Sequence, residues 1–253
     1  MRLFLGRYMG TRGKGLSAFQ LKIIACISML IDHITYVFIP EESEPSWMGV
    51  SIPYLVGRCI GRTAFIILAF LLVEGFFYSK NRKKYLLRLG IAAFIAEPVF
   101  DYMCGIWSFP ACLGHQNVLF LFALGLILLS LLETVRECYY IKSRLKYNAF
   151  SVFFCVLGFL IAHFLNFDYG EVGIGLILIF YFMRGARKGY VALMVFVWSL
   201  ISLGLSHMLE WAGLIALIPI FMYKGEKGKD ARWAFYAFYP LHMLVLILLY
   251  KLI

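Results

Sequence analysis

Ionisable side chains that can move protons or stabilise negative charge lie inside apolar stretches of this 253-residue sequence. Asp32 and His33 stand near the end of the first apolar run, and Arg58 and Arg62 lie within the second. Histidine is the side chain whose charge changes near neutral pH, so His33 is a candidate general base. Guanidinium groups can stabilise a developing oxyanion in a site that excludes water. Group-transfer chemistry assisted by His33 is therefore one interpretation of these residues.

The spacing of further charges indicates that they face the protein interior. Arg58 and Arg62 are four residues apart, which places them on one helix face. Glu97 and Asp101 in the third apolar run have the same spacing. Each such charge costs about 2.5–3.5 kcal/mol at the centre of an inserting helix, so partners are required. From the helix directions we expect Arg58 at the depth of Asp101, and Arg62 at the depth of Glu97.

Asp32 needs a partner of its own. Adjacent residues on a helix point about 100° apart, so Asp32 need not bond to His33 and can pair with Arg58 or Arg62 instead. An ion-pair ladder that only locks helix packing is the alternative interpretation. The histidine beside the carboxylate favours a functional site over that alternative.

Three other polar residues are candidates for lining the same site. Gln116 and Asn117 open the fourth predicted helix. His242 follows Tyr239 and Pro240, where a proline kink frees backbone groups, and its structural and site-lining interpretations are equally supported. No spacing of cysteines and histidines is typical of zinc ligands, so we expect no metal.

The composition requires that lipid surrounds most of the chain. Hydrophobic residues make up 62% of the sequence and charged residues 15%, whereas soluble domains are roughly half apolar and a quarter charged. Apolar runs of about 15–25 residues without strict alternation predict transmembrane helices. We therefore expect an all-α, polytopic transmembrane bundle forming a single domain over 1–253. The predicted helices span 17–39, 53–78, 86–103, 116–133, 148–166, 170–183, 190–209, 211–223 and 232–252, of which the sixth and eighth are short for a full span.

The basic residues predict the orientation of the chain. Five segments, 2–22, 80–88, 136–146, 184–188 and 224–232, contain 21 of the 24 lysines and arginines. The alternate loops contain none and hold acidic residues instead. The positive-inside rule then puts the N-terminus in the cytoplasm and, with nine spans, the C-terminus outside. This distribution also explains the net charge of +10 without a nucleic-acid partner.

Several segments along nearly the whole chain stand in an order and spacing typical of a known family. These are LSAFQLKIIA (16–25), MLIDH (29–33), IGRTAF (60–65), AFLLVEGFF (69–77), NRKKYLLRL (81–89), EP (97–98) with Asp101, QNV (116–118), DYG (168–170) and FYPLH (238–242). In this order and spacing they resemble the TraX family, within the broader acyltransferase-3-like membrane enzymes.

The resemblance implies an acetyltransferase in the bacterial cytoplasmic membrane. TraX is named for the protein that acetylates the N-terminus of conjugative pilin subunits, and the broader group uses cytoplasmic acetyl-CoA. His33 would then be the catalytic base, with Asp32 steadying its charge and Arg58 and Arg62 lining the site. Acetyl-CoA is expected as a co-substrate, with no permanently bound cofactor. A direct transfer and an acetyl-histidine intermediate both remain open.

The partners of this reaction are predicted only by class. The acceptor is a membrane-associated or extracytoplasmic peptide, pilin or glycan. The phosphates of coenzyme A are expected at Lys83, Lys84 and Arg88, although positive-inside loops alone also account for those charges and are the simpler explanation. The residues expected to bind substrate or donor are Glu97, Asp101, Gln116, Asn117, His242, Lys83, Lys84 and Arg88.

Two other classes of function fit the same residues. A transporter for a polar or anionic solute also needs buried arginine, acid and histidine, but an odd number of helices without a detectable inverted repeat is unlike many such proteins. A non-catalytic membrane scaffold would use the charges only for packing.

Overall fold

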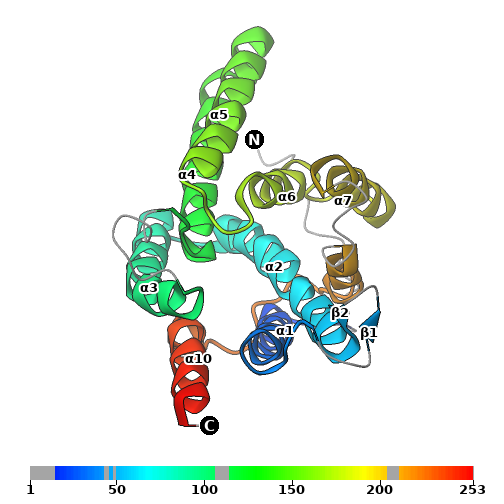
Figure 1. The fold of residues 1–253 in the computed structure, drawn as a ribbon. Helices are drawn as coiled ribbons and strands as arrows, with labels where there is room; N and C mark the ends of the chain where they lie inside the picture. The colour runs from blue at the N-terminus through cyan, green and yellow to red at the C-terminus, as the bar shows by residue number, and fades with distance from the viewer. Residues whose placement is uncertain (1–14, 43–45, 48–49, 106–113, 204–210, 253) are drawn as a thin grey trace. The chain divides into compact units, whose positions relative to one another are not determined.

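The computed structural model describes residues 15–42, 46–47, 50–105, 114–203 and 211–252. Within these ranges each of the nine predicted segments forms helix. One short antiparallel strand pair lies between the first two of these segments. The elements are α1 (Ala18–Phe38), β1 (Ser46–Trp47), β2 (Val50–Ser51), α2 (Ile52–Tyr78), α3 (Arg82–Met103), α4 (Val118–Tyr139), α5 (Arg144–Phe164), α6 (Gly170–Phe182), α7 (Lys188–Leu203), η2 (Ala212–Ala216), α9 (Leu217–Phe221) and α10 (Arg232–Leu252). The predicted all-α fold is confirmed (Figure 1).

Helices α3, α4 and α5 extend four or more residues beyond the predicted bounds, because charged turns join them. Helix α5 starts at Arg144 rather than 148, with Ser143 as its N-cap. Helix α3 starts at Arg82 rather than 86, since the side-chain oxygen of Asn81 caps it by accepting from the Lys84 N–H at 2.9 Å. Helix α4 continues past Glu133, whose carboxylate is paired with Arg136 one turn later. The end of the predicted helix 190–209 after Leu203 lies outside the described residues.

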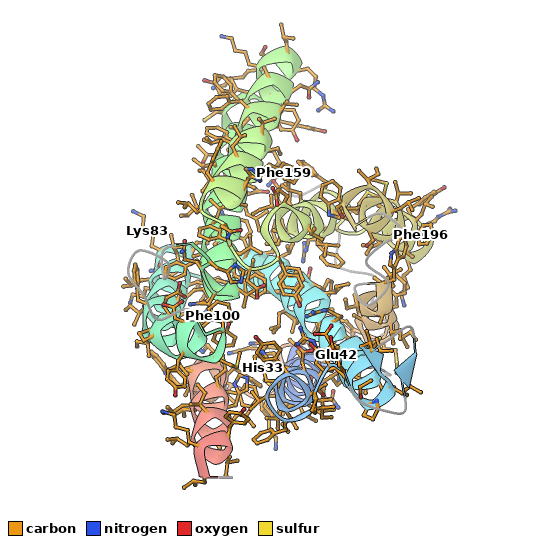
Figure 2. The ribbon with its side chains drawn as sticks, viewed as in Figure 1. His33, Glu42, Lys83, Phe100, Phe159 and Phe196 are labelled. Carbon is orange, nitrogen blue, oxygen red and sulfur yellow. The ribbon has the colours of Figure 1, made fainter. Side chains whose placement is uncertain are left out.

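Five of the described helices, α1, α2, α4, α5 and α10, are long and apolar enough to cross a membrane. Helix α3 has 22 residues but carries charges within its apolar part. Along α5, Phe153 is 57% exposed and Phe164 is 78% exposed, and side chains project along the helix in Figure 2. Water does not stabilise such a row of large apolar side chains, so lipid covers it and the chain is a membrane protein. Nine full spans remain a prediction.

The chain divides into two compact units, residues 1–71 with 182–253, and residues 72–181. The first unit contains α1, most of α2, the strand pair, α7, η2, α9 and α10. The second contains α3, α4, α5, the end of α2 and most of α6. The single domain expected over 1–253 stays a prediction.

In the first unit, the segment before α10 is hydrogen-bonded to the N-terminal end of α1. The N–H groups of Ala18 and Phe19 donate to the carbonyls of Glu226 at 2.8 Å and Lys227 at 3.0 Å. The Ser17 side chain caps the same helix end, so the first N–H groups of α1 are satisfied. Helices α1 and α10 also pack against each other. The backbone hydrogen bonds and the packing of α1 against α10 together fix the position of α1 relative to α10.

In the second unit, α4 packs against both α3 and α5. Gly158 of α5 allows close contact, because a Cβ there would lie 2.9 Å from a methyl carbon of Leu128. Leu128 is 2% exposed and Leu129 is fully buried, so the α4 face between its neighbours forms the core of this unit.

Candidate functional site

Helix α2 approaches α1 through two glycines four residues apart. A Cβ on Gly57 would overlap the side chain of Thr35, and a Cβ on Gly61 would overlap that of Asp32. Small residues at this spacing let helices approach closely in lipid, where dispersion and polar contacts drive packing. The hydroxyl of Thr63 also donates to Ser28 of α1 at 3.0 Å. This close approach positions the residue that follows each glycine beside α1.

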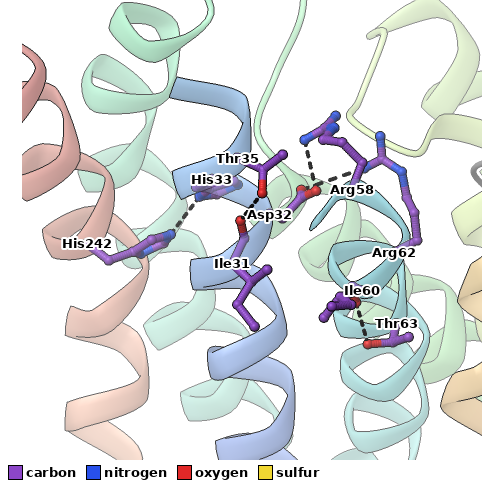
Figure 3. A network of polar contacts seen from close by, with 9 residues as sticks. All are labelled: Ile31, Asp32, His33, Thr35, Arg58, Ile60, Arg62, Thr63 and His242. Carbon is purple, nitrogen blue, oxygen red and sulfur yellow. Dashed lines mark hydrogen bonds and ion pairs between the residues drawn. The ribbon is translucent and has the colours of Figure 1, made fainter. Parts of the chain in front are cut away.

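Those following residues are the two arginines, and both face Asp32 (Figure 3). Nη1 of Arg58 lies 2.9 Å from Oδ1 of Asp32, and Nη1 of Arg62 lies 3.8 Å from Oδ2. All three side chains are largely buried: that of Asp32 is 10% exposed, that of Arg58 15% and that of Arg62 16%. Two guanidinium groups beside one carboxylate, all three little exposed, can stabilise a developing or bound anion.

The pairing of Asp32 with an arginine rather than with His33 is confirmed. The expected match in depth between Arg58 and Asp101, and between Arg62 and Glu97, stays a prediction, whereas the ion pairs of both arginines described here are with Asp32. Arg58 also lies over the ring of Tyr36, 5.3 Å from its centroid. A tyrosine ring attracts a guanidinium group and helps to hold it in place.

His33 points away from Asp32 and toward His242 of α10 (Figure 3). Nδ1 of His33 lies 2.7 Å from Nε2 of His242. Nδ1 of His242 lies 2.7 Å from the carbonyl oxygen of Phe238. His242 is 7% exposed, and both of its ring nitrogens are engaged by protein groups. Three helices therefore contribute to one polar cluster within the first unit, formed by Asp32, His33, Arg58, Arg62 and His242.

The second unit contains its own polar group around Asn117. The side-chain amide of Asn117 donates to the Ala93 carbonyl at 2.9 Å and to Glu97, while its oxygen accepts from the Leu119 N–H at 2.9 Å. Asn117 is fully buried and caps α4. Because its amide donors and its oxygen are used by the protein, this residue joins α3 to α4. A role of Asn117 in binding substrate stays a prediction.

The other expected binding residues lie near this group or at the start of α3. Asp101 is buried, at 8% exposure, one turn after Glu97. The backbone of Gln116 pairs with the 166–168 segment, accepting from the Asp168 N–H at 2.8 Å. Lys83, labelled in Figure 2, and Lys84 are exposed in the first turn of α3, and Arg88 is half-buried one turn later. Their roles in binding stay predictions.

The basic loop before α10 differs from the start of α3 because it contains two acidic residues that pair with its basic ones. Asp230 accepts from Lys227 at 2.8 Å and from Arg232 at 2.8 Å, and Lys224 pairs with Glu226. Hydrogen bonds from Lys227 and Arg232 hold the pKa of Asp230 well below its ordinary value. Any stabilisation from these pairs is therefore present above the ordinary pKa of an aspartate, about 4, and is lost as the pH falls below it. The ion pairs compensate part of the basic charge of the loop, since its two acidic residues face four basic ones.

Replacing Gly61 by alanine tests the close helix approach. We expect Gly61→Ala to destabilise the folded protein by about 1–3 kcal/mol, because the new methyl group overlaps the Asp32 side chain. Gly90→Ala is the matched control, since a Cβ at this helical glycine meets no atom within 4 Å. The measurement is the thermal unfolding midpoint of each variant in the same detergent. Equal midpoints for Gly61→Ala and the parent would show that the approach is not tight.

Sequence reasoning found the ionisable residues but missed the two glycines. The signal was present as Gly57-Arg58-Cys59-Ile60-Gly61, a G-x-x-x-G pattern in an apolar helix. The contact between His33 and His242 carried no such signal, because the two residues are 209 positions apart.

The fold and this cluster define a class of polytopic helical membrane proteins with a histidine beside a carboxylate held by two arginines. Within that class, the chain belongs to the TraX family: the family described as "TraX protein" matches residues 17–250. All the residues of the polar cluster lie within that range.

One curated relative is similar over part of its length. It is a probable fimbrial assembly protein FimC, serogroup H1, from Dichelobacter nodosus, 39% identical over 124 residues. The match covers 47% of this chain and spans about half the length of the relative, 48%. No solved structure matches this chain.

Proposed function

We propose that this chain transfers an acetyl group from acetyl-CoA to an amine or hydroxyl of a membrane-associated or extracytoplasmic acceptor. The observation that carries the proposal is the cluster of His33 with Asp32, Arg58 and Arg62, a potential base and two guanidinium groups within apolar helices. A structural ion-pair ladder needs no histidine, whereas acyl transfer needs both a base and an oxyanion partner.

In the proposed reaction the acceptor nitrogen or oxygen attacks the carbonyl carbon of the thioester. The new bond to carbon forms as His33 takes the proton from the acceptor. Arg58 or Arg62 stabilises the oxyanion of the tetrahedral intermediate, an effect worth a few kcal/mol where water is excluded. The C–S bond then breaks, and the departing sulfur takes the proton from His33 to give the free thiol of CoA. Direct transfer is the simpler path, and transfer through an acetyl-histidine is the alternative.

The acceptor is proposed to be a pilin or another peptide with a free N-terminus. Support comes from membership of the TraX family and from the similarity to a protein named for fimbrial assembly. A glycan hydroxyl is the alternative acceptor, and it would receive the acetyl group by the same reaction. The proposed location is the bacterial cytoplasmic membrane, with the N-terminus inside and the C-terminus outside.

The phosphates of the donor are proposed to bind at the start of α3. Arg82, Lys83 and Lys84 occupy its first turn, where no acidic residue is present and where the helix dipole disfavours cations. A bound phosphate would relieve that repulsion and accept from the turn. The buried Nε of Arg88 has no hydrogen-bond partner among the described residues and is suited to the same anion.

Charge reversal at this turn is expected to weaken donor use. Lys83→Glu with Lys84→Glu should raise the KM for acetyl-CoA about tenfold or more, with a smaller change in kcat, because uniform binding energy is lost. Lys142→Glu with Lys146→Glu is the matched control, since it reverses two basic residues at another helix start, one just before α5 and one in its first turn. Steady-state kinetics in proteoliposomes measures both. Equal KM values in the two double variants would place the phosphates elsewhere.

One experiment separates the proposal from a transporter and from a scaffold. Purified protein is incubated with labelled acetyl-CoA, and the same preparation is reconstituted to measure uptake of small anionic solutes. Release of CoA thiol supports the acetyltransferase. Solute uptake without thiol release would instead identify a transporter, and the absence of both would leave only a packing role for the charges.

A further inference from the structure

The contact between His33 and His242 is a hydrogen bond in the plane of the two rings. The rings are parallel within 6°, their centroids are 4.8 Å apart, and the facing nitrogens are 2.7 Å apart. Parallel planes whose nearest atoms are 2.7 Å apart cannot be separated by more than that distance. Face-to-face stacking needs about 3.5 Å or more between ring atoms. The rings therefore meet edge to edge, with one proton between the two nitrogens.

The carbonyl of Phe238 decides where that proton lies. A carbonyl oxygen only accepts, so Nδ1 of His242, at 2.7 Å from it, carries a hydrogen. A neutral imidazole has one N–H, which leaves Nε2 of His242 as an acceptor. The hydrogen bond to His33 must then be donated by Nδ1 of His33. The remaining nitrogen of His33, Nε2, keeps its lone pair.

The orientation of His242 is itself fixed by the protein. The ring of Phe238, one turn earlier on α10, stacks on the imidazole with centroids 4.5 Å apart and planes within 8°. His242 is 7% exposed, so water does not compete for its nitrogens. The carbonyl, the phenyl ring and His33 together leave His242 a single arrangement.

We propose that His242 is a positioning residue that holds His33 as the Nδ1–H tautomer and thereby presents Nε2 of His33 as the base. This inference rests on the proposed function for its chemical meaning. The step it assigns is balanced: the proton of the acceptor N–H or O–H moves to Nε2 of His33, and the same proton later moves from Nε2 to the CoA sulfur. Nδ1 of His33 keeps its proton throughout, donated to His242. His242 does not contact the reacting atoms.

Two variants at position 242 separate positioning from packing. Glutamine can accept from His33 through its side-chain oxygen, whereas methionine fills similar space and has only a weak acceptor sulfur. We expect His242→Met to lower kcat about 100-fold or more, since loss of the orienting acceptor in a serine protease triad costs about 10⁴-fold. His242→Gln should retain most of the activity, with KM unchanged in both.

A spectroscopic readout tests the tautomer independently of catalysis. Nitrogen-15 NMR of histidine-labelled protein reports which ring nitrogen carries hydrogen. The chain has five histidines, so the signal of His33 is assigned as the one that is lost in His33→Gln.

The parent and His242→Gln should show His33 protonated at Nδ1 and unprotonated at Nε2. His242→Met should lose this fixed pattern. A protonated Nε2 in neutral His33 of the parent, or an unchanged pattern in His242→Met, would overturn the proposal. If the parent showed the expected protonation pattern of His33 but transferred no acetyl group, His242 would keep its positioning role and only the proposed function would be refuted.

Discussion

Replacing His33 by glutamine is expected to abolish acetyl transfer while the protein stays folded. Glutamine has a similar size and can still accept from or donate to its neighbours, but it cannot take a proton near neutral pH. Loss of a general base costs about 10²–10⁴-fold in rate, and more if the same residue also holds the acetyl group. The measurement is kcat/KM for thiol release in proteoliposomes, with the unfolding midpoint recorded for each preparation.

The control for His33 is a histidine outside the cluster. His163 lies at the end of α5, is 64% exposed in its side chain, and pairs with Glu171. His163→Gln should keep kcat/KM within about twofold of the parent, since exposed ion pairs contribute little. If His33→Gln retained more than a tenth of the parent activity, the assignment of the base would be wrong.

The second large effect is expected on stability, at Asp32. This carboxylate lies between Arg58 and Arg62 and is 7% exposed as a residue. Asp32→Asn keeps the shape but leaves two guanidinium charges facing a neutral amide. Breaking a buried ion pair by neutralising one partner costs about 3–5 kcal/mol. We therefore expect a large drop in the unfolding midpoint of Asp32→Asn, together with lost activity.

An exposed aspartate with the same kind of partners provides the control. Asp230 also pairs with two cations, Lys227 and Arg232, but on the surface of the loop before α10. Asp230→Asn should leave the unfolding midpoint unchanged within measurement, because water and salt already screen that pair. Equal midpoints for Asp32→Asn and Asp230→Asn would show that the buried cluster contributes nothing to folding.

The helices and the ionisable residues of the site could be predicted because each depends on local sequence. Apolar runs determine where helices form in lipid, and a spacing of four residues determines which charges share a face. The helix ends at Arg82, after Glu133 and at Arg144 were missed. A charged turn is typical of a loop, although a side-chain cap or an ion pair can continue the helix into it. Those corrections need contacts that a hydropathy pattern does not contain.

The partners across helices could be predicted only in part. Counting residues from the loops gives a depth in the membrane, but it does not say which helices are neighbours. The arginines therefore matched the acids of α3 in depth, while their ion pairs are with Asp32. His242 could be interpreted as structural or site-lining from the proline before it, and its contact with His33 depends on the packing of α1 against α10.

Binding of labelled acetyl-CoA to the purified protein tests the proposed donor without knowledge of the acceptor. Equilibrium dialysis against the folded parent protein should give saturable binding of about one molecule per chain, displaced by unlabelled CoA. His33→Gln should bind equally, because the base acts on the reaction and not on the donor phosphates. Folded protein that shows no saturable binding of acetyl-CoA would contradict the proposed acetyltransferase.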